Sequence, residues 1–191
     1  MLRVFLLMAG MLWSSAVLAD GWNIGWLVTE SQFKLSDHDG PSAAKAEFGL
    51  MNFVLAAPRE RDDRFLAQLS LDRFDTAAST TGIGASVKRL DASLSYQTRL
   101  RASRYWKPWV GIGLGFANET QRSRYTVRSD GFLARSYPEI NQNGLVAVVN
   151  ATSEWAIAEQ WTLGVHLQYE EPLGHTARGL RAGLIVLFEL R

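Results

Sequence analysis

The chain has 191 residues, of which 47% are hydrophobic, with no cysteine and a formal charge of +1 at pH 7. The lack of cysteine excludes a disulfide framework and a cysteine metal site. The balanced charge gives no electrostatic case for nucleic-acid binding.

The first 19 residues have the pattern of a cleaved signal peptide. Arg3 precedes an apolar run, and Val17-Leu18-Ala19 matches the small-x-small cleavage rule ahead of Asp20. The apolar run is too short to span a bilayer as a helix. We therefore predict that residues 1–19 are removed on export and that residues 20–191 form one domain.

The rest of the chain alternates between apolar and polar residues with a period of two, which is typical of strands. In the segment 161–170, one face is apolar and the other is Thr162, Gly164, His166, Gln168 and Glu170. The segment 180–190 repeats this pattern, although Ile185 and Leu187 blur its second face. Another segment carries a glycine face, which predicts a crowded interior with larger neighbours. Its glycines are Gly111, Gly113 and Gly115.

This periodicity predicts eight strands, near residues 22–35, 45–56, 64–74, 87–100, 107–118, 143–155, 161–171 and 180–190. The connections at 36–44, 75–86, 119–142 and 172–179 are mostly long, and those at 57–63, 101–106 and 156–160 are short. Long loops at one end and short turns at the other are typical of outer-membrane barrels. The predicted fold is all-β, an eight-stranded antiparallel up-and-down transmembrane β-barrel.

Alternation alone does not decide whether the apolar face meets lipid, because soluble barrels such as lipocalins share it. Tryptophans at strand ends beside the short turns favour lipid, since they predict an aromatic girdle at a membrane–water interface. The predicted girdle is Trp22, Trp106, Trp109, Trp155 and Trp161. The opposite face suits a hydrated or ion-paired lumen. Its predicted polar network is Asp91, Arg99, His166, Gln168, Glu170 and Arg181. A simple hairpin at 172–179 would place Glu170 opposite Arg181 as an ion pair.

Three features together resemble the small outer-membrane β-barrel superfamily that includes the OmpA membrane domain, OmpX and OmpW. They are the export signal, the glycine-alternating strand Trp109 to Phe116, and the Trp155 to Trp161 turn followed by a tyrosine-ended strand. The resemblance covers the whole mature chain. It implies a location in the outer membrane of a Gram-negative cell. It also implies contact with outer-membrane lipids and lipopolysaccharide and assembly by the barrel-assembly machinery.

The longest predicted loop carries the arginines Arg122, Arg124, Arg128 and Arg135, interleaved with aromatic residues. On a cell surface these guanidinium groups would pair with lipopolysaccharide phosphates or bind an external partner. The alternative is a mobile loop whose charges keep it soluble.

No catalytic, cofactor or metal site is predicted. The three histidines are His38, His166 and His175. A lipid hydrolase would need one of them beside a nucleophile and a carboxylate, and none lies in such a motif. The run Asp37-His38-Asp39-Gly40 lacks the calcium-loop pattern and predicts a solvated turn.

An eight-stranded barrel is narrow enough for inward side chains to fill it. The leading hypothesis is therefore a non-enzymatic outer-membrane protein with a structural or surface-interaction role through its extracellular loops. A narrow channel for small or apolar solutes and a lipopolysaccharide-modifying enzyme are the alternatives.

Overall fold

The computed structural model of the protein describes residues 21–35, 44–60, 62–100 and 106–190, and the side chains of these ranges except 44–51. The strands are β1 (Trp22–Lys34), β2 (Ala44–Glu60), β3 (Asp63–Asp75), β4 (Gly84–Arg99), β5 (Trp106–Val127), β6 (Leu133–Tyr137), β7 (Ile140–Ala156), β8 (Trp161–Pro172) and β9 (Arg178–Leu190). No helix in these ranges is long and apolar enough to cross a membrane. The predicted signal peptide and the run Asp37-His38-Asp39-Gly40 lie outside the described residues.

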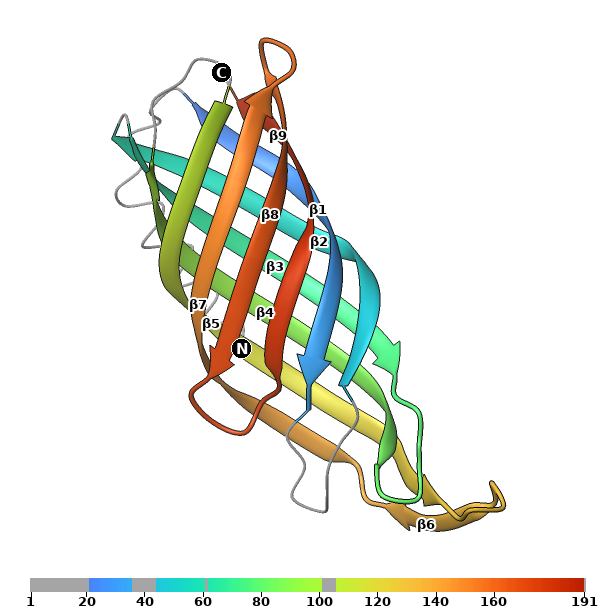
Figure 1. The fold of residues 1–191 in the computed structure, drawn as a ribbon. Helices are drawn as coiled ribbons and strands as arrows, with labels where there is room; N and C mark the ends of the chain where they lie inside the picture. The colour runs from blue at the N-terminus through green and yellow to red at the C-terminus, as the bar shows by residue number, and fades with distance from the viewer. Residues whose placement is uncertain (1–20, 36–43, 61, 101–105, 191) are drawn as a thin grey trace.

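Eight of the strands close into an antiparallel barrel, which confirms the predicted architecture (Figure 1). The strand order is β4-β3-β2-β1-β9-β8-β7-β5, and a further ladder between β4 and β5 closes the circle. Trp22 pairs with Leu190 in the ladder between the first and last strands. Both described chain ends therefore lie at the same end of the barrel, together with the short turns. We call this the terminal end.

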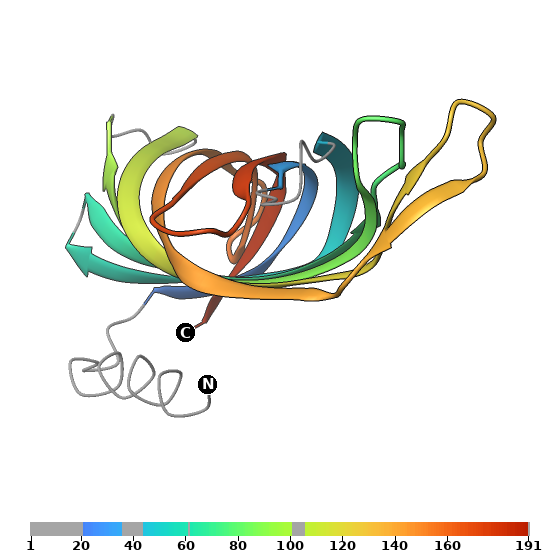
Figure 2. The same ribbon diagram turned by 90° about the horizontal axis from the view of Figure 1, so that it is seen from below.

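The predicted loop 119–142 is wrong, because most of it is strand. β5 continues to Val127, β6 pairs with its last residues, and β7 begins at Ile140. This hairpin, residues 122–139, projects beyond the barrel at the end opposite the termini, and we call it the arm (Figure 2). The inward alternation continues through Glu119 and Gln121, which are 0% and 1% exposed. The outward residues there are polar, so the apolar signal stops before the strand does.

The outer face carries a continuous apolar band. Its side chains include Ile112, Val149 and Leu184, which are 69%, 54% and 53% exposed. Toward the arm end the band stops at a row of polar outward residues, which includes Arg73, Lys88 and Glu171. An apolar belt on the outside and polar residues inside is the distribution expected of a barrel in lipid.

Part of the interior is apolar, which explains the blurred face of the last strand. Ile185 and Leu187 point inward and are 0% and 1% exposed. They pack in a cluster with Leu27, Val54, Ala56 and Leu66. This cluster fills one side of the lumen near the terminal end, so the inward face is not polar throughout.

The glycine face of β5 is crowded, as predicted, but by backbone more than by large side chains. A Cβ at Gly113 would lie 2.1 Å from the Leu94 carbonyl oxygen and 2.6 Å from the Ser95 Cα of β4. Glycine therefore permits the close approach of β4 and β5 that closes the barrel.

We expect Gly113→Ala to lower the free energy of unfolding by about 1–3 kcal/mol, because backbone must shift to admit the methyl group. Urea unfolding in detergent micelles, followed by tryptophan fluorescence, measures this change. The control is Gly144→Ala, whose added Cβ would meet only the Thr176 Cγ2 atom at 3.8 Å. Equal effects of the two substitutions would contradict the close-approach explanation.

Candidate functional site

The lumen contains a buried group of two guanidinium groups and four carboxylates, which we call the central cluster. Strands β3, β4, β5, β8 and β9 supply its members. None is more than 4% exposed. The members are Arg89, Arg181, Asp72, Asp91, Glu119 and Glu170.

Arg181 joins carboxylates from three other strands. Its Nη1 donates to Glu170, and its Nη2 donates to Asp91 and, at 2.9 Å, to Asp72 Oδ2. One side chain of β9 thus ties β3, β4 and β8 across the interior of the barrel.

Arg89 shares two of these carboxylates, Asp91 and Glu170, and also contacts Glu119. Its Nε lies 3.0 and 2.9 Å from the two oxygens of Asp91, and its Nη2 donates to Glu170 at 2.8 Å. Its Nη1 donates to the Ala177 carbonyl at 2.7 Å and lies 3.5 Å from Glu119 Oε2. The Phe33 ring lies against both guanidinium groups, with the Cζ atoms of Arg89 and Arg181 4.8 and 5.1 Å from its centroid.

This arrangement satisfies most of the buried charge. Removing ions from water costs several kcal/mol each unless they are paired and hydrogen-bonded. Each arginine of the cluster contacts at least two carboxylates, and Glu119 also accepts hydrogen bonds from Gln121 and the Ala177 amide. The cluster therefore occupies part of the lumen and links five strands.

A second buried pair lies nearer the terminal end. Arg64 binds Glu154 through two hydrogen bonds of 3.0 and 2.5 Å and donates to Gln97 at 2.7 Å. Trp109 Nε1 donates to the same glutamate at 3.1 Å, and the Arg64 Cζ atom lies 4.1 Å from the Trp109 ring centroid. This pair packs the lumen beside the apolar cluster.

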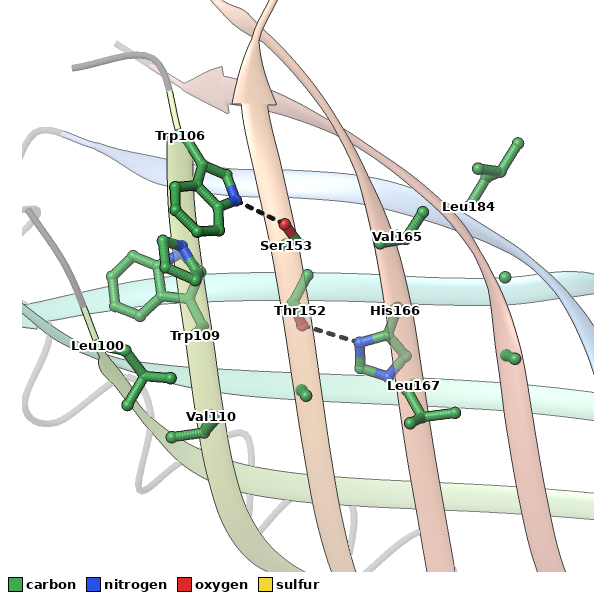
Figure 3. Close-up of a pocket in the computed structure, with 14 residues that line it drawn as sticks. Leu100, Trp106, Trp109, Val110, Thr152, Ser153, Val165, His166, Leu167 and Leu184 are labelled. Carbon is green, nitrogen blue, oxygen red and sulfur yellow. Dashed lines mark hydrogen bonds between the residues drawn. The ribbon is translucent and has the colours of Figure 1, made fainter. Parts of the chain in front are cut away.

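A chain of neutral polar groups leads from this region to the central cluster. Thr152 lies 2.9 Å from His166 Nδ1 (Figure 3). On the other side of the ring, His166 Nε2 lies 3.3 Å from Gln168 Oε1. Gln168 then donates to Glu170 at 2.7 Å. Among the described residues, neither ring nitrogen of His166 contacts a carboxylate. His166 thus lacks the orienting acid that an acid–base pair needs.

Most of the predicted lumen network comes together. Asp91, His166, Gln168, Glu170 and Arg181 lie within one connected set of contacts. The predicted pair between Glu170 and Arg181 forms, although Arg181 stands opposite Gln168 rather than Glu170 in the ladder. The pair is therefore diagonal, offset by two residues.

Arg99 lies apart from this set. It is eight residues from Asp91 along β4, at the terminal end, and its Nε donates to Asp62 at 2.9 Å. Arg99 and Asp91 are an even number of residues apart, which predicts that both face inward, but the distance along the strand separates Arg99 from the central cluster.

Several members of the two buried groups escaped the sequence prediction. Asp72 and Arg89 share the inward face with predicted polar residues of β3 and β4. The alternation itself puts Asp72 on the polar face of its strand, and Arg89 follows by the same parity from Asp91. Glu119 was assigned to a loop. The pairing of Arg64 with Glu154, 90 residues later, has no local signal.

Four of the predicted girdle tryptophans lie on the outer face near the terminal end. Trp106, Trp155 and Trp161 are 39%, 42% and 46% exposed, and Trp22 is half-buried. The prediction for Trp109 is wrong, because this side chain is 7% exposed and hydrogen-bonded inside the lumen. Residues 106 and 109 differ by an odd number, so a regular strand turns them to opposite faces.

The arm brings three of its four arginines to the surface. Arg122, Arg128 and Arg135 are exposed, whereas Arg124 is 1% exposed and donates to the Pro138 carbonyl at 2.7 Å. The prediction of Arg124 as a surface contact is therefore wrong. The positive φ of 48° at Ser123 marks an irregularity in the alternation just before it. The arm also exposes the large side chains Tyr125, Phe132 and Leu133.

Two of the exposed arginines of the arm have no acidic partner among the described residues. Arg122 pairs with Glu139 at 3.1 Å, but no ion pair joins Arg128 or Arg135 to a carboxylate there. Arg135 lies over the Tyr137 ring, with its Cζ atom 4.9 Å from the centroid.

A separate surface pair lies on the barrel rim, outside the apolar band. Arg178 donates to Glu171 at 2.6 Å, and this hydrogen bond holds the pKa of Glu171 below its ordinary value.

The described residues contain no group of three or more His, Asp or Glu side chains placed to hold a metal ion.

Comparison with known proteins identifies the fold. No protein-family model matches the chain, and no curated protein matches its sequence. Among solved structures, neisserial surface protein A has a TM-score of 0.61 at 11% identity, covering 88% of this chain and 97% of that one. The attachment invasion locus protein Ail of Yersinia pestis, in complex with the heparin analogue sucrose octasulfate, has a TM-score of 0.57 at 13% identity, covering 90% and 100%. Ail as an outer membrane protein in a phospholipid bilayer nanodisc has a TM-score of 0.50 at 11% identity, covering 90% and 100%. The chain therefore has the fold of small eight-stranded outer-membrane β-barrels.

The central cluster should dominate stability. We expect Arg181→Met to lower the free energy of unfolding by about 3–5 kcal/mol, because it leaves buried carboxylates without their partner. Thermal loss of the compact, heat-modifiable band on cold SDS gels, together with urea titration, measures the change. The matched control Arg122→Met removes an exposed ion pair and should cost no more than about 1 kcal/mol. A loss of similar size in both variants would refute the assignment of stability to the cluster.

Proposed function

We propose that this chain is a non-enzymatic integral outer-membrane protein that binds anionic groups at the cell surface through its arm. The observation that carries the proposal is the contrast between a lumen crossed by ion pairs and an arm that exposes Arg128 and Arg135, which have no acidic partner in the described part of the chain. The apolar band with tryptophans at the terminal end supports membrane embedding. If the short turns face the periplasm, as is typical of outer-membrane barrels, the arm lies outside the cell, and we adopt this orientation in the proposal.

The chemistry of the arm supports a phosphate- or sulfate-bearing ligand. Guanidinium groups bind such oxyanions with paired hydrogen bonds, and exposed aromatic side chains beside them pack against sugar rings. Lipopolysaccharide carries phosphates at the surface where the arm would lie, so we propose lipopolysaccharide as the ligand. The complex of Ail with a polysulfated sugar supports the idea that a barrel of this fold accommodates such a ligand.

The two alternatives receive less support. A narrow channel would need a path past Arg89 and Arg181, whose side chains are 0% exposed within the lumen. A lipid-modifying enzyme would need a histidine held by a carboxylate, and His166 contacts Thr152 and Gln168 instead.

Binding of lipopolysaccharide tests the proposal. In protein reconstituted into phospholipid nanodiscs, Arg128→Gln with Arg135→Gln should weaken binding by about tenfold or more. Each charged hydrogen bond contributes about 1.5 kcal/mol or more. The control Arg59→Gln removes an exposed arginine at the terminal end and should bind as the unmodified protein does. Binding that is unchanged in the double variant would refute the arm as the ligand site.

Shortening the arm separates binding from folding. Gln121 pairs with Ile140, so an Asn-Gly turn in place of residues 122–139 would close the hairpin at that pair. This variant should lose lipopolysaccharide binding and keep a heat-modifiable barrel. Loss of the barrel itself would show that the arm is required for folding.

Planar-bilayer recording tests the channel alternative. We expect no discrete conductance from the refolded protein, because the ion pairs of the central cluster cross the lumen. If the Arg181→Met variant folds and conducts ions, the central cluster is what blocks the lumen of the unmodified protein. Reproducible conductance in the unmodified protein would favour the channel instead.

A further inference from the structure

The outer wall carries a furrow with a volume of about 630 Å³ (Figure 3). Residues of β5, β7, β8 and β9 line it, near the terminal end. The outward side chains along it are uncharged, and Val165, Leu167 and Leu184 are 46%, 48% and 53% exposed. The furrow is thus an apolar depression in the face that carries the apolar band.

Small outward side chains on β7 produce the furrow. Ala151 and Ser153 stand where the same face of the strand otherwise carries Val149 and Trp155. In the ladders, Ala151 lies between Val110 and Leu167. Larger side chains therefore stand on both sides of a low floor.

The floor continues toward β9. Leu167 pairs with Ala182, and Leu184 pairs with Val165. On β9 the small side chain of Ala182 therefore continues the depression. It lies between the larger side chains of Leu180 and Leu184 on the same outward face.

One polar group lies at the terminal end of the furrow. Trp106 Nε1 donates to Ser153 Oγ at 2.7 Å (Figure 3). The Ser153 hydroxyl accepts this bond and donates none among the described hydrogen bonds, so it has a hydrogen to offer. Because Trp106 and Trp155 stand beside it, the hydroxyl lies at the level of the tryptophan girdle, where lipid chains meet their polar headgroups.

We propose that the furrow retains one acyl chain of a phospholipid from the periplasmic leaflet, whose ester carbonyl accepts a hydrogen bond from Ser153. This inference rests on the membrane embedding proposed above. The furrow lies near the terminal end, away from the arm, so it opens to the periplasmic leaflet rather than to the surface leaflet that carries lipopolysaccharide. Its lack of charged outward side chains suits the hydrocarbon part of the ligand.

Retention cannot come from the hydrophobic effect, because the surrounding bilayer is as apolar as the furrow. It must come from van der Waals contact with the walls and from the hydrogen bond that Ser153 donates. Filling the floor with a larger apolar side chain should therefore displace the acyl chain of the lipid without changing the polarity of the surface.

The experiment counts phospholipids that remain on the barrel. The full chain is inserted into phosphatidylethanolamine vesicles, extracted into mild detergent and weighed by native mass spectrometry. We expect one phosphatidylethanolamine per barrel. Ala151→Leu should reduce retention by about tenfold, and Ser153→Ala should reduce it less, as the loss of one hydrogen bond predicts.

Ala147→Leu is the matched control, because residue 147 lies on the outward face of the same strand but outside the furrow. It should retain lipid as the unmodified protein does. The proposal would be overturned if the Ala151→Leu variant retained as much lipid as the unmodified protein. It would also be overturned if the Ala147→Leu variant lost as much lipid as the Ala151→Leu variant. A lipid-free dimer would overturn it too, because it would make the furrow an interface between copies.

A parallel arm of the experiment uses vesicles that also contain lipopolysaccharide. Preferential retention of lipopolysaccharide would overturn the choice of phospholipid. If the chain inserts but retains no lipid, only this inference fails. If it does not enter vesicles at all, both this inference and the proposed membrane location fail.

Discussion

Pairing of the buried charges is the constraint on which the rest of this barrel depends. Arg89 and Arg181 lie in the lumen with four carboxylates, and neither arginine is exposed to solvent. Charges in such a place are tolerated only when their partners are held in position. The arginines and the carboxylates together come from five strands, so the closed ladder and the ion pairs require each other. A barrel opened between any of these strands would leave charge unpaired.

Because ion pairs occupy the lumen, ligand contacts at the cell surface depend on residues outside the barrel interior. The arm continues the β5–β7 hairpin past the barrel, where its backbone is supported by strand pairing rather than by a loop alone. Pairing between β5 and β6 orders the backbone of the arm, and an ordered segment loses less entropy on binding than a flexible loop does. The barrel thus serves as the base of a structured hairpin, to which we assign the proposed binding role.

The outer wall is less uniform than its apolar composition suggests. Trp106 and Ser153 form a hydrogen-bonded pair at the girdle, next to a floor of small side chains. Differences in side-chain size along one strand are enough to give a barrel wall a local shape. In the proposal above, this shape distinguishes one lipid position from the rest of the apolar band.

The sequence by itself determined the eight barrel strands, the direction of most of their side chains and four of the outward tryptophans, because period-two alternation is a property of neighbouring residues. The odd spacing between Trp106 and Trp109 also predicts the inward position of Trp109, because residues an odd number apart in a strand face opposite sides. Only the tertiary structure decided that Arg64 meets Glu154 and that Arg181 meets Asp72 and Asp91. It also decided the arm and the furrow. These features depend on strand register and on closure of the sheet, which join residues far apart in the chain and have no local signal.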